Sequence, residues 1–127
     1  MIDWVTKAVV LAIHEEQIAE HGGLNGVRNI ATLESALARP QQLQAYGGQP
    51  DIAALAAAYG LGVARSQAFI DGNKRTSYVV TTAFLLLNGY DLTADEMSRL
   101  QIWERLGEGS LSEKEFAGWL RANIKKT

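Results

Sequence analysis

Apolar side chains recur along most of this chain at intervals of three and four residues, the spacing of one face of an α-helix. The first helix is expected from Thr6 to His21, because Gly22 and Gly23 then provide a C-terminal stop. No segment shows the strict alternation of apolar and polar residues that predicts a half-buried strand. The pattern therefore predicts an all-α protein without a sheet.

Asparagine and proline set the expected limits of a second helix. Asn29 is suited to cap its N-terminus with a side-chain oxygen. Pro40 should end this helix near Arg39, because proline disfavours helical geometry in the residue before it. Residues 41–49 are then expected to form a connecting loop.

Two stretches in the middle of the chain are apolar on nearly every face. The first is rich in alanine and follows Pro50 and Asp51, which suit a turn and an N-cap. The second runs from about Asn73 to a stop at Asn88-Gly89. Helices that lack a polar face belong in a protein interior, so we expect both at the centre of the molecule.

Two capping-box patterns predict the helix starts of the C-terminal third. They are Thr93-Ala94-Asp95-Glu96, with Leu92 and Met97 spaced for a hydrophobic staple, and Ser112-Glu113-Lys114-Glu115. The last helix is expected to carry one apolar stripe as far as Ile124 and to end in lysines.

Composition narrows the class of protein. The chain has 127 residues, of which 47% are apolar and 20% charged, typical of one globular domain over residues 1–127. The net charge of −2 offers no basic field for direct nucleic-acid binding. No apolar run reaches the ~20 residues of a membrane span. The absence of cysteine and of a basic, apolar leader favours the cytoplasm.

A polar, glycine-containing loop interrupts the most apolar part of the chain. Lys74 and Arg75 follow it in the first turn of a helix, where the macrodipole disfavours cations unless an anion is bound. Gly72 permits the close backbone approach that a phosphate requires, and Asp71 is placed to hold Mg²⁺. These features favour a nucleotide site. An equally simple interpretation is a turn capped by Asn73 and followed by solvated surface charges.

The stretch from Phe69 to Thr76, Phe-Ile-Asp-Gly-Asn-Lys-Arg-Thr, resembles the second part of the Fic/Doc family signature. Segments around His14, Leu33 to Leu37 and Asn88 to Tyr90 are similar to Doc-type members in the same order. The resemblance implies a compact bundle of about six helices. The segment from Phe69 to Thr76, called the signature loop, would join the two central helices. The resemblance also implies that Phe69 is a buried anchor without a chemical role.

Residue by residue, the resemblance implies ATP and Mg²⁺ as ligands of the loop. Asp71 would hold the metal ion, Gly72 and Asn73 would contribute to an anion hole, and Lys74 and Arg75 would bind nucleotide phosphates. Arg65, just before the loop, is a further candidate for the phosphates, although a surface ion pair is an equally good interpretation.

The sequence departs from the family at the catalytic base, because Gln67 stands where the signature has histidine. Glutamine forms hydrogen bonds but does not titrate, and loss of a general base typically costs a factor of about 10²–10⁴ in rate. The chain is therefore expected to be inactive or strongly impaired. A naturally degenerate member and a deliberate His-to-Gln substitution in a toxic protein both explain this, and the intact remainder of the site favours the second. His14 is interpreted as a core histidine with a satisfied hydrogen bond rather than as a replacement base.

The function implied by the resemblance is that of a Doc-type toxin, which transfers phosphate from ATP to elongation factor Tu and arrests translation. A partly disordered antitoxin that folds on binding is the implied partner and would supply any contact with DNA. One alternative is AMP transfer, against which Lys74 and Tyr78 argue, because AMP-transferring members usually have glycine and arginine there. The other is a non-catalytic module that binds nucleotide or antitoxin.

Overall fold

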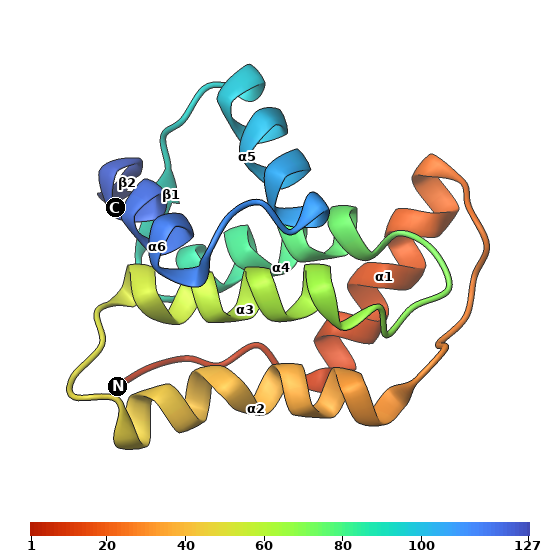
Figure 1. The fold of residues 1–127 in the computed structure, drawn as a ribbon, viewed down its shortest axis with the longest axis horizontal. Helices are drawn as coiled ribbons and strands as arrows, with labels where there is room; N and C mark the ends of the chain where they lie inside the picture. The colour runs from red at the N-terminus through yellow and green to blue at the C-terminus, as the bar shows by residue number, and fades with distance from the viewer.

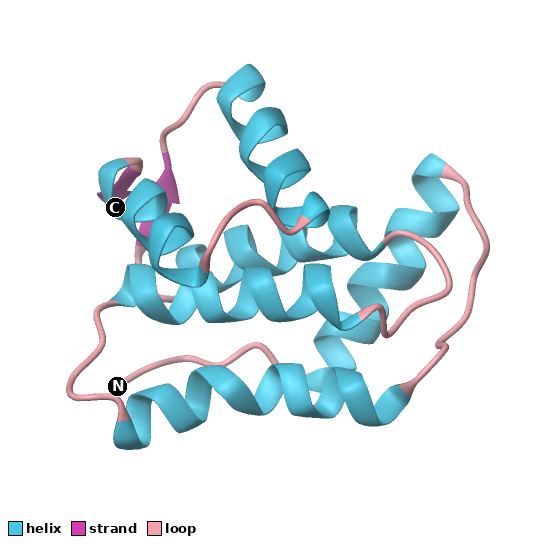
Figure 2. Ribbon diagram, in the orientation of Figure 1, coloured by secondary structure: helices cyan, strands magenta, loops and turns pink.

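Helices form most of the chain in the computed structural model, which describes all 127 residues (Figures 1 and 2). The helices are α1 (Lys7–His21), α2 (Ile30–Tyr46), α3 (Ile52–Ser66), α4 (Asn73–Leu87), α5 (Glu96–Glu108) and α6 (Glu113–Ala122). Two short strands, β1 (Tyr90–Leu92) and β2 (Ile124–Lys126), pair antiparallel. The expectation of an all-α fold of about six helices is confirmed. None of the helices is both long and apolar enough to cross a bilayer.

Helix α3 lies at the centre of the molecule and contacts α2, α4, α5 and α6 (Figure 1). Its alanines are buried on several faces, and Gly62 lies so close to α2 that an added Cβ would be 3.3 Å from the Ala36 Cβ. Small side chains thus let neighbouring helices approach closely. Helix α4 packs along α3 but leaves Leu86 and Leu87 exposed at its C-terminal end, so it is buried less completely than predicted.

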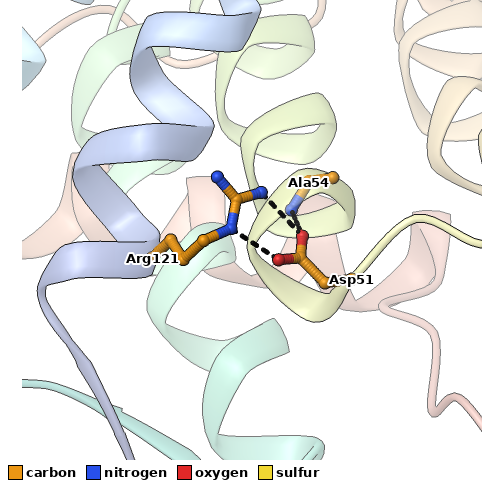
Figure 3. Close-up of polar contacts among 3 residues, drawn as sticks. All are labelled: Asp51, Ala54 and Arg121. Carbon is orange, nitrogen blue, oxygen red and sulfur yellow. Dashed lines mark hydrogen bonds and ion pairs between the residues drawn. The ribbon is translucent and has the colours of Figure 1, made fainter.

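Five helices begin with an N-cap residue whose side-chain oxygen accepts a hydrogen bond from a backbone N–H of the first turn. The capping residues are Thr6, Asn29, Asp51, Asp95 and Ser112. At Asp51 the carboxylate accepts from the Ala54 N–H at 2.9 Å and from Arg121 Nε at 2.6 Å, which ties the start of α3 to α6 (Figure 3). The predicted caps at Asn29 and Asp51 and the capping box at Ser112 are confirmed.

The predicted end of the second helix at Arg39 is wrong, because α2 continues through Pro40 to Tyr46. Residues 41–46, expected in a loop, are therefore helical. Pro40 is buried on the face of α2 that also buries Leu33, Ala36 and Leu37. Continuing the helix keeps this face packed on the core, and tertiary packing of this kind outweighs the local preference against proline.

The predicted absence of a sheet is also wrong. Residues 124–126 pair with 90–92, and the Thr93 N–H and the Thr93 hydroxyl both donate to the Asn123 carbonyl. These bonds hold Thr93 against Asn123 beside the sheet, so α5 is capped instead by Asp95, and Met97 is exposed rather than part of a staple. Helix α6 consequently ends at Ala122, and Ile124 belongs to a strand.

Candidate functional site

A hollow of about 430 Å³ lies between the loop that joins α3 to α4 and the C-terminal half of α5. It brings together most residues that the sequence singled out. Its lining comprises Ala64, Gln67, Ile70, Asp71, Gly72, Asn73, Lys74, Arg75, Glu104, Gly107 and Glu108. The signature loop therefore forms one wall of a pocket whose other wall comes from a helix distant in the sequence.

The N-terminus of α4 opens into this pocket without a side-chain cap, unlike the other five helices. Its N-cap residue is Gly72, which has a φ of 77°, a left-handed conformation that glycine adopts without strain. The first N–H groups of a helix have no partner within the helix, so those of α4 remain able to bind an anion. A side chain at position 72 would also crowd Ile18, since an added Cβ would be 3.1 Å from its Cδ1.

The Asp71 carboxylate is held by two backbone N–H groups. Oδ1 accepts from Gly72 at 2.9 Å and Oδ2 accepts from Leu24 at 3.2 Å. The bond from Leu24, and then the bond from Gly72, hold the pKa of the Asp71 carboxyl below its ordinary value. Asp71 is therefore ionised at neutral pH, and each carboxylate oxygen keeps a lone pair for another ligand.

Two hydrogen bonds between Asn73 and Phe69 fix the conformation of the loop between α3 and α4. The Asn73 side chain accepts from the Phe69 N–H at 3.1 Å and donates to the Phe69 carbonyl at 3.0 Å. Phe69 itself is fully buried and forms a bridge with Val27. Asn73 therefore contributes to an anion site only through its backbone N–H, because its side chain is occupied in the loop.

Lys74 and Arg75 line the pocket from the first turn of α4, and each has a partner of its own. Lys74 Nζ lies 2.6 Å from a carboxylate oxygen of Glu104, and Arg75 donates to the Gly22 carbonyl at 3.0 Å. Both side chains remain accessible, since Lys74 is exposed and Arg75 is half-buried. A phosphate at the start of α4 would compete for Lys74 with Glu104.

Gln67 ends α3 as its C-cap and lines the same pocket. Its backbone is left-handed, with a φ of 52°, and its side-chain amide donates to the Ala64 carbonyl at 3.4 Å. His14 is buried, and its Nε2 donates to the Asp71 carbonyl at 2.8 Å, which confirms the prediction of a core histidine with a satisfied hydrogen bond.

Arg65 is the one predicted site residue that does not line this pocket. Its guanidinium donates to the carbonyls of Leu106 and Leu111, at the end of α5 and in the following loop. Arg65 thus fastens α5 to α3 and affects the pocket through the position of its far wall.

The sequence did not identify the acidic residues of that wall, Glu104 and Glu108. They are one helical turn apart on α5, but a pair of glutamates on an exposed helix face carries no signal of a site. Their place opposite the loop follows only from the packing of α5 against α4.

The residues present fit a magnesium ion bound together with phosphates. Mg²⁺ typically takes one or two carboxylates and completes its coordination with phosphate oxygens and water, and Asp71 supplies such a carboxylate. Three carboxylates and two cations line the pocket, so a polyphosphate alone would meet a net negative surface. A divalent cation at Asp71 would reverse that balance.

Comparison with known proteins gives matches over most of the chain. A family model described as Fic/DOC family matches residues 4–85. The chain is 32% identical over 109 residues to a protein named "Protein kinase doc" from Escherichia phage P1, covering 85% of this chain and 86% of that protein. It is 42% identical over 76 residues to a protein named "Toxin Doc" from Mycolicibacterium smegmatis, covering 58% of each.

Proposed function

The chain belongs to the Fic/Doc family, and we propose that it is the Doc-type toxin of a toxin–antitoxin module. The proposed activity is transfer of the γ-phosphoryl group of ATP to a hydroxyl of elongation factor Tu, which arrests translation. The observation that carries the proposal is the shared pocket, which is lined by Gln67, by the uncapped N-terminus of α4, and by Asp71, Lys74 and Arg75.

Each part of the pocket has a role in this reaction. Lys74, Arg75 and the first N–H groups of α4 bind and orient the phosphates. Asp71 would hold Mg²⁺, which would offset the negative charge of the phosphates. The hydroxyl oxygen of the target forms a bond to the γ-phosphorus, the bond from that phosphorus to the bridging oxygen breaks, and ADP leaves. The hydroxyl proton passes to a base at position 67.

Gln67 cannot take that proton, so the chain with this residue is proposed to bind nucleotide and to transfer phosphate poorly or not at all. The backbone at position 67 supports histidine as the residue suited to this place. Left-handed geometry is uncommon for residues other than glycine, and histidine is among the side chains enriched in it. Gln67→His therefore needs no change of backbone.

Phosphate transfer is favoured over AMP transfer by the surroundings of Tyr78. Its hydroxyl accepts from Arg99 at 2.8 Å, and its ring packs edge-on against Trp103 at a centroid distance of 4.9 Å. Position 78 thus holds α5 against α4 and offers no second arginine to a nucleotide. A non-catalytic binding module would have the same pocket. It differs from the enzyme proposal only in its expected result for Gln67→His, which would bind nucleotide but transfer no phosphate.

The partner proposed for this toxin is an antitoxin with a partly disordered segment that folds on binding. The name "Toxin Doc" of the relative from Mycolicibacterium smegmatis supports the assignment of this chain as the toxin of the module. Coupled folding suits a switchable inhibitor, because the cost of ordering the segment keeps its binding reversible.

The experiment is transfer of labelled phosphate from ATP to purified elongation factor Tu by Gln67→His, run beside a growth curve of cells without antitoxin. We expect Gln67→His to exceed the parent chain by a factor of about 10²–10⁴ and to arrest growth. Asp71→Ala in the Gln67→His background should abolish the gain, because it removes the metal ligand.

The mass added to the target separates the alternatives. A phosphoryl group supports the proposal, and an adenylyl group supports AMP transfer. A Gln67→His variant that folds, binds nucleotide, modifies nothing and harms no cell would contradict the enzyme proposal and leave the binding module.

A further inference from the structure

His14 connects α1 to the signature loop across 57 positions of sequence. Its side chain is only 3% exposed, and its Nε2 lies 2.8 Å from the Asp71 carbonyl oxygen. A carbonyl oxygen only accepts hydrogen bonds, so Nε2 carries the proton in this contact. The ring is therefore a buried donor aimed at the backbone of the candidate metal ligand.

The orientation of that donor is fixed by a second contact. The His14 ring stacks on Phe69, with ring centroids 3.8 Å apart and planes 7° from parallel. Phe69 is fully buried, and Asn73 holds its backbone at both the N–H and the carbonyl. A ring stacked on so fixed a partner has little freedom to tilt, so its in-plane N–H stays directed at Asp71.

The Asp71 side chain is exposed, so its position depends on such hydrogen bonds. Its carboxylate is bound by the N–H groups of Gly72 and Leu24, and Leu24 follows the turn that ends α1. Helix α1 therefore holds the Asp71 carbonyl through His14, and the segment that follows α1 holds the Asp71 carboxylate through Leu24. Loss of the His14 donor would free the carbonyl to rotate and would misalign the carboxylate with both amides.

We propose that His14 is a positioning residue that holds the Asp71 carboxylate ready for a divalent cation bound with phosphates. The role rests on the proposed function for the identity of the ligand, but the restraint on Asp71 exists without any ligand. His14 takes no part in proton transfer, and its hydrogen bond sets the geometry of the residue that would hold the metal ion.

The test uses His14→Phe, which keeps a stacking ring and removes the donor, and His14→Gln, whose amide reaches about as far as Nε2. Val10→Ala, one turn earlier on α1 and fully buried, is the control for a general loss of stability. The first readout is amide hydrogen exchange without ligand. The exchange rates of the Leu24 and Gly72 amides are compared with that of the Ala54 amide. Its N–H also donates to an aspartate carboxylate, but at the other end of α3.

We expect His14→Phe to speed exchange at Leu24 and Gly72 by a factor of about ten, equivalent to the loss of one hydrogen bond, and to leave Ala54 unchanged. His14→Gln should restore most of the protection. The second readout is calorimetric binding of a non-hydrolysable ATP analogue with and without Mg²⁺. Only the Mg²⁺-dependent part of the affinity should fall in His14→Phe, again by about ten-fold.

The proposal is overturned if His14→Phe matches Val10→Ala in both exchange and Mg²⁺ dependence. Should His14→Phe fail to fold, His14→Asn replaces it, because its shorter amide cannot reach the Asp71 carbonyl while His14→Gln can. Equal exchange rates at Leu24 and Gly72 in His14→Asn and His14→Gln would then overturn the proposal. If the parent chain binds no nucleotide, the proposed function fails, and the exchange readout still decides whether His14 positions Asp71.

Discussion

The Lys74 ammonium group lies 2.6 Å from a carboxylate oxygen of Glu104, so α5 supplies the partner of a cation placed for phosphate. The two side chains are 44% and 55% exposed, and exposed ion pairs contribute little to stability. Glu104→Gln frees Lys74 and removes a negative charge beside the bound phosphates. We expect calorimetry to show nucleotide binding tightened by a factor of about 2–10.

Glu34→Gln is the control, because it removes a similar ion pair, with Lys7, that does not line the pocket. Weaker nucleotide binding in Glu104→Gln would contradict the expectation and show that Glu104 holds Lys74 in its binding position.

Gly22 and Gly23 offer a matched test of whether the position of the Asp71 carboxylate matters for nucleotide binding. Both have positive φ, 81° at Gly22 and 117° at Gly23, so alanine strains the backbone at either position. An added Cβ meets nothing within 4 Å at Gly22 but lies 2.8 Å from Asp71 Oδ2 at Gly23. We expect both variants to lose about 1 kcal/mol of stability. Only Gly23→Ala should lose Mg²⁺-dependent nucleotide affinity, by about ten-fold in calorimetry, and equal affinities would contradict this.

Two helical glycines should respond to alanine with opposite signs. At Gly60 in α3 an added Cβ would lie 2.6 Å from the Thr81 hydroxyl and 2.7 Å from the Phe116 ring. At Gly118 in α6 it meets nothing within 4 Å. Gly60→Ala is expected to destabilise by about 1–3 kcal/mol through overpacking, and Gly118→Ala to stabilise by about 0.5–1 kcal/mol. Urea unfolding measures both, and a stabilised Gly60→Ala would show that α3 is free to move away from α4 and α6.

The Asp51 carboxylate should make stability depend on pH. Its hydrogen bonds from Arg121, and then that from Ala54, lower the pKa of its carboxyl. A depressed folded-state pKa stabilises the fold above the unfolded-state pKa, and this stabilisation is lost as pH falls through the folded-state pKa. Asp51→Asn keeps a capping oxygen and removes the charge. We expect it to cost about 0.5–1 kcal/mol at pH 7, since the pair is solvent-exposed, and nothing once the pH is well below about 4.

Unfolding curves of both proteins between pH 7 and pH 2 measure this difference. Glu34→Gln provides the comparison, because it removes an exposed carboxylate that caps no helix. A gap that stayed constant down to pH 2 would mean that Asp51→Asn acts through packing rather than charge.

Local patterns determined where most helices begin, because caps and turns involve neighbouring residues. Asn29, Asp51 and Ser112 cap helices as their sequence context predicts. The errors occurred where a distant segment decided the outcome. Pro40 stays helical because α3 packs on that face of α2. Thr93 does not cap α5 because its N–H and hydroxyl donate to the Asn123 carbonyl, next to the sheet. Contacts of this kind have no signature in either segment alone.

In the candidate site, too, features set by neighbouring residues could be predicted from the sequence, and features set by distant segments could not. One short motif was enough to predict the family, the role of the segment from Asp71 to Arg75 and the replacement of histidine by Gln67. The surroundings of that motif depended on the fold, which puts Glu104 beside Lys74, directs Arg65 at a carbonyl near the end of α5, and lets His14 donate to the Asp71 carbonyl. Each of these contacts joins distant segments brought together by burial of the core, and the placement of those segments depends on the packing of all the helices at once.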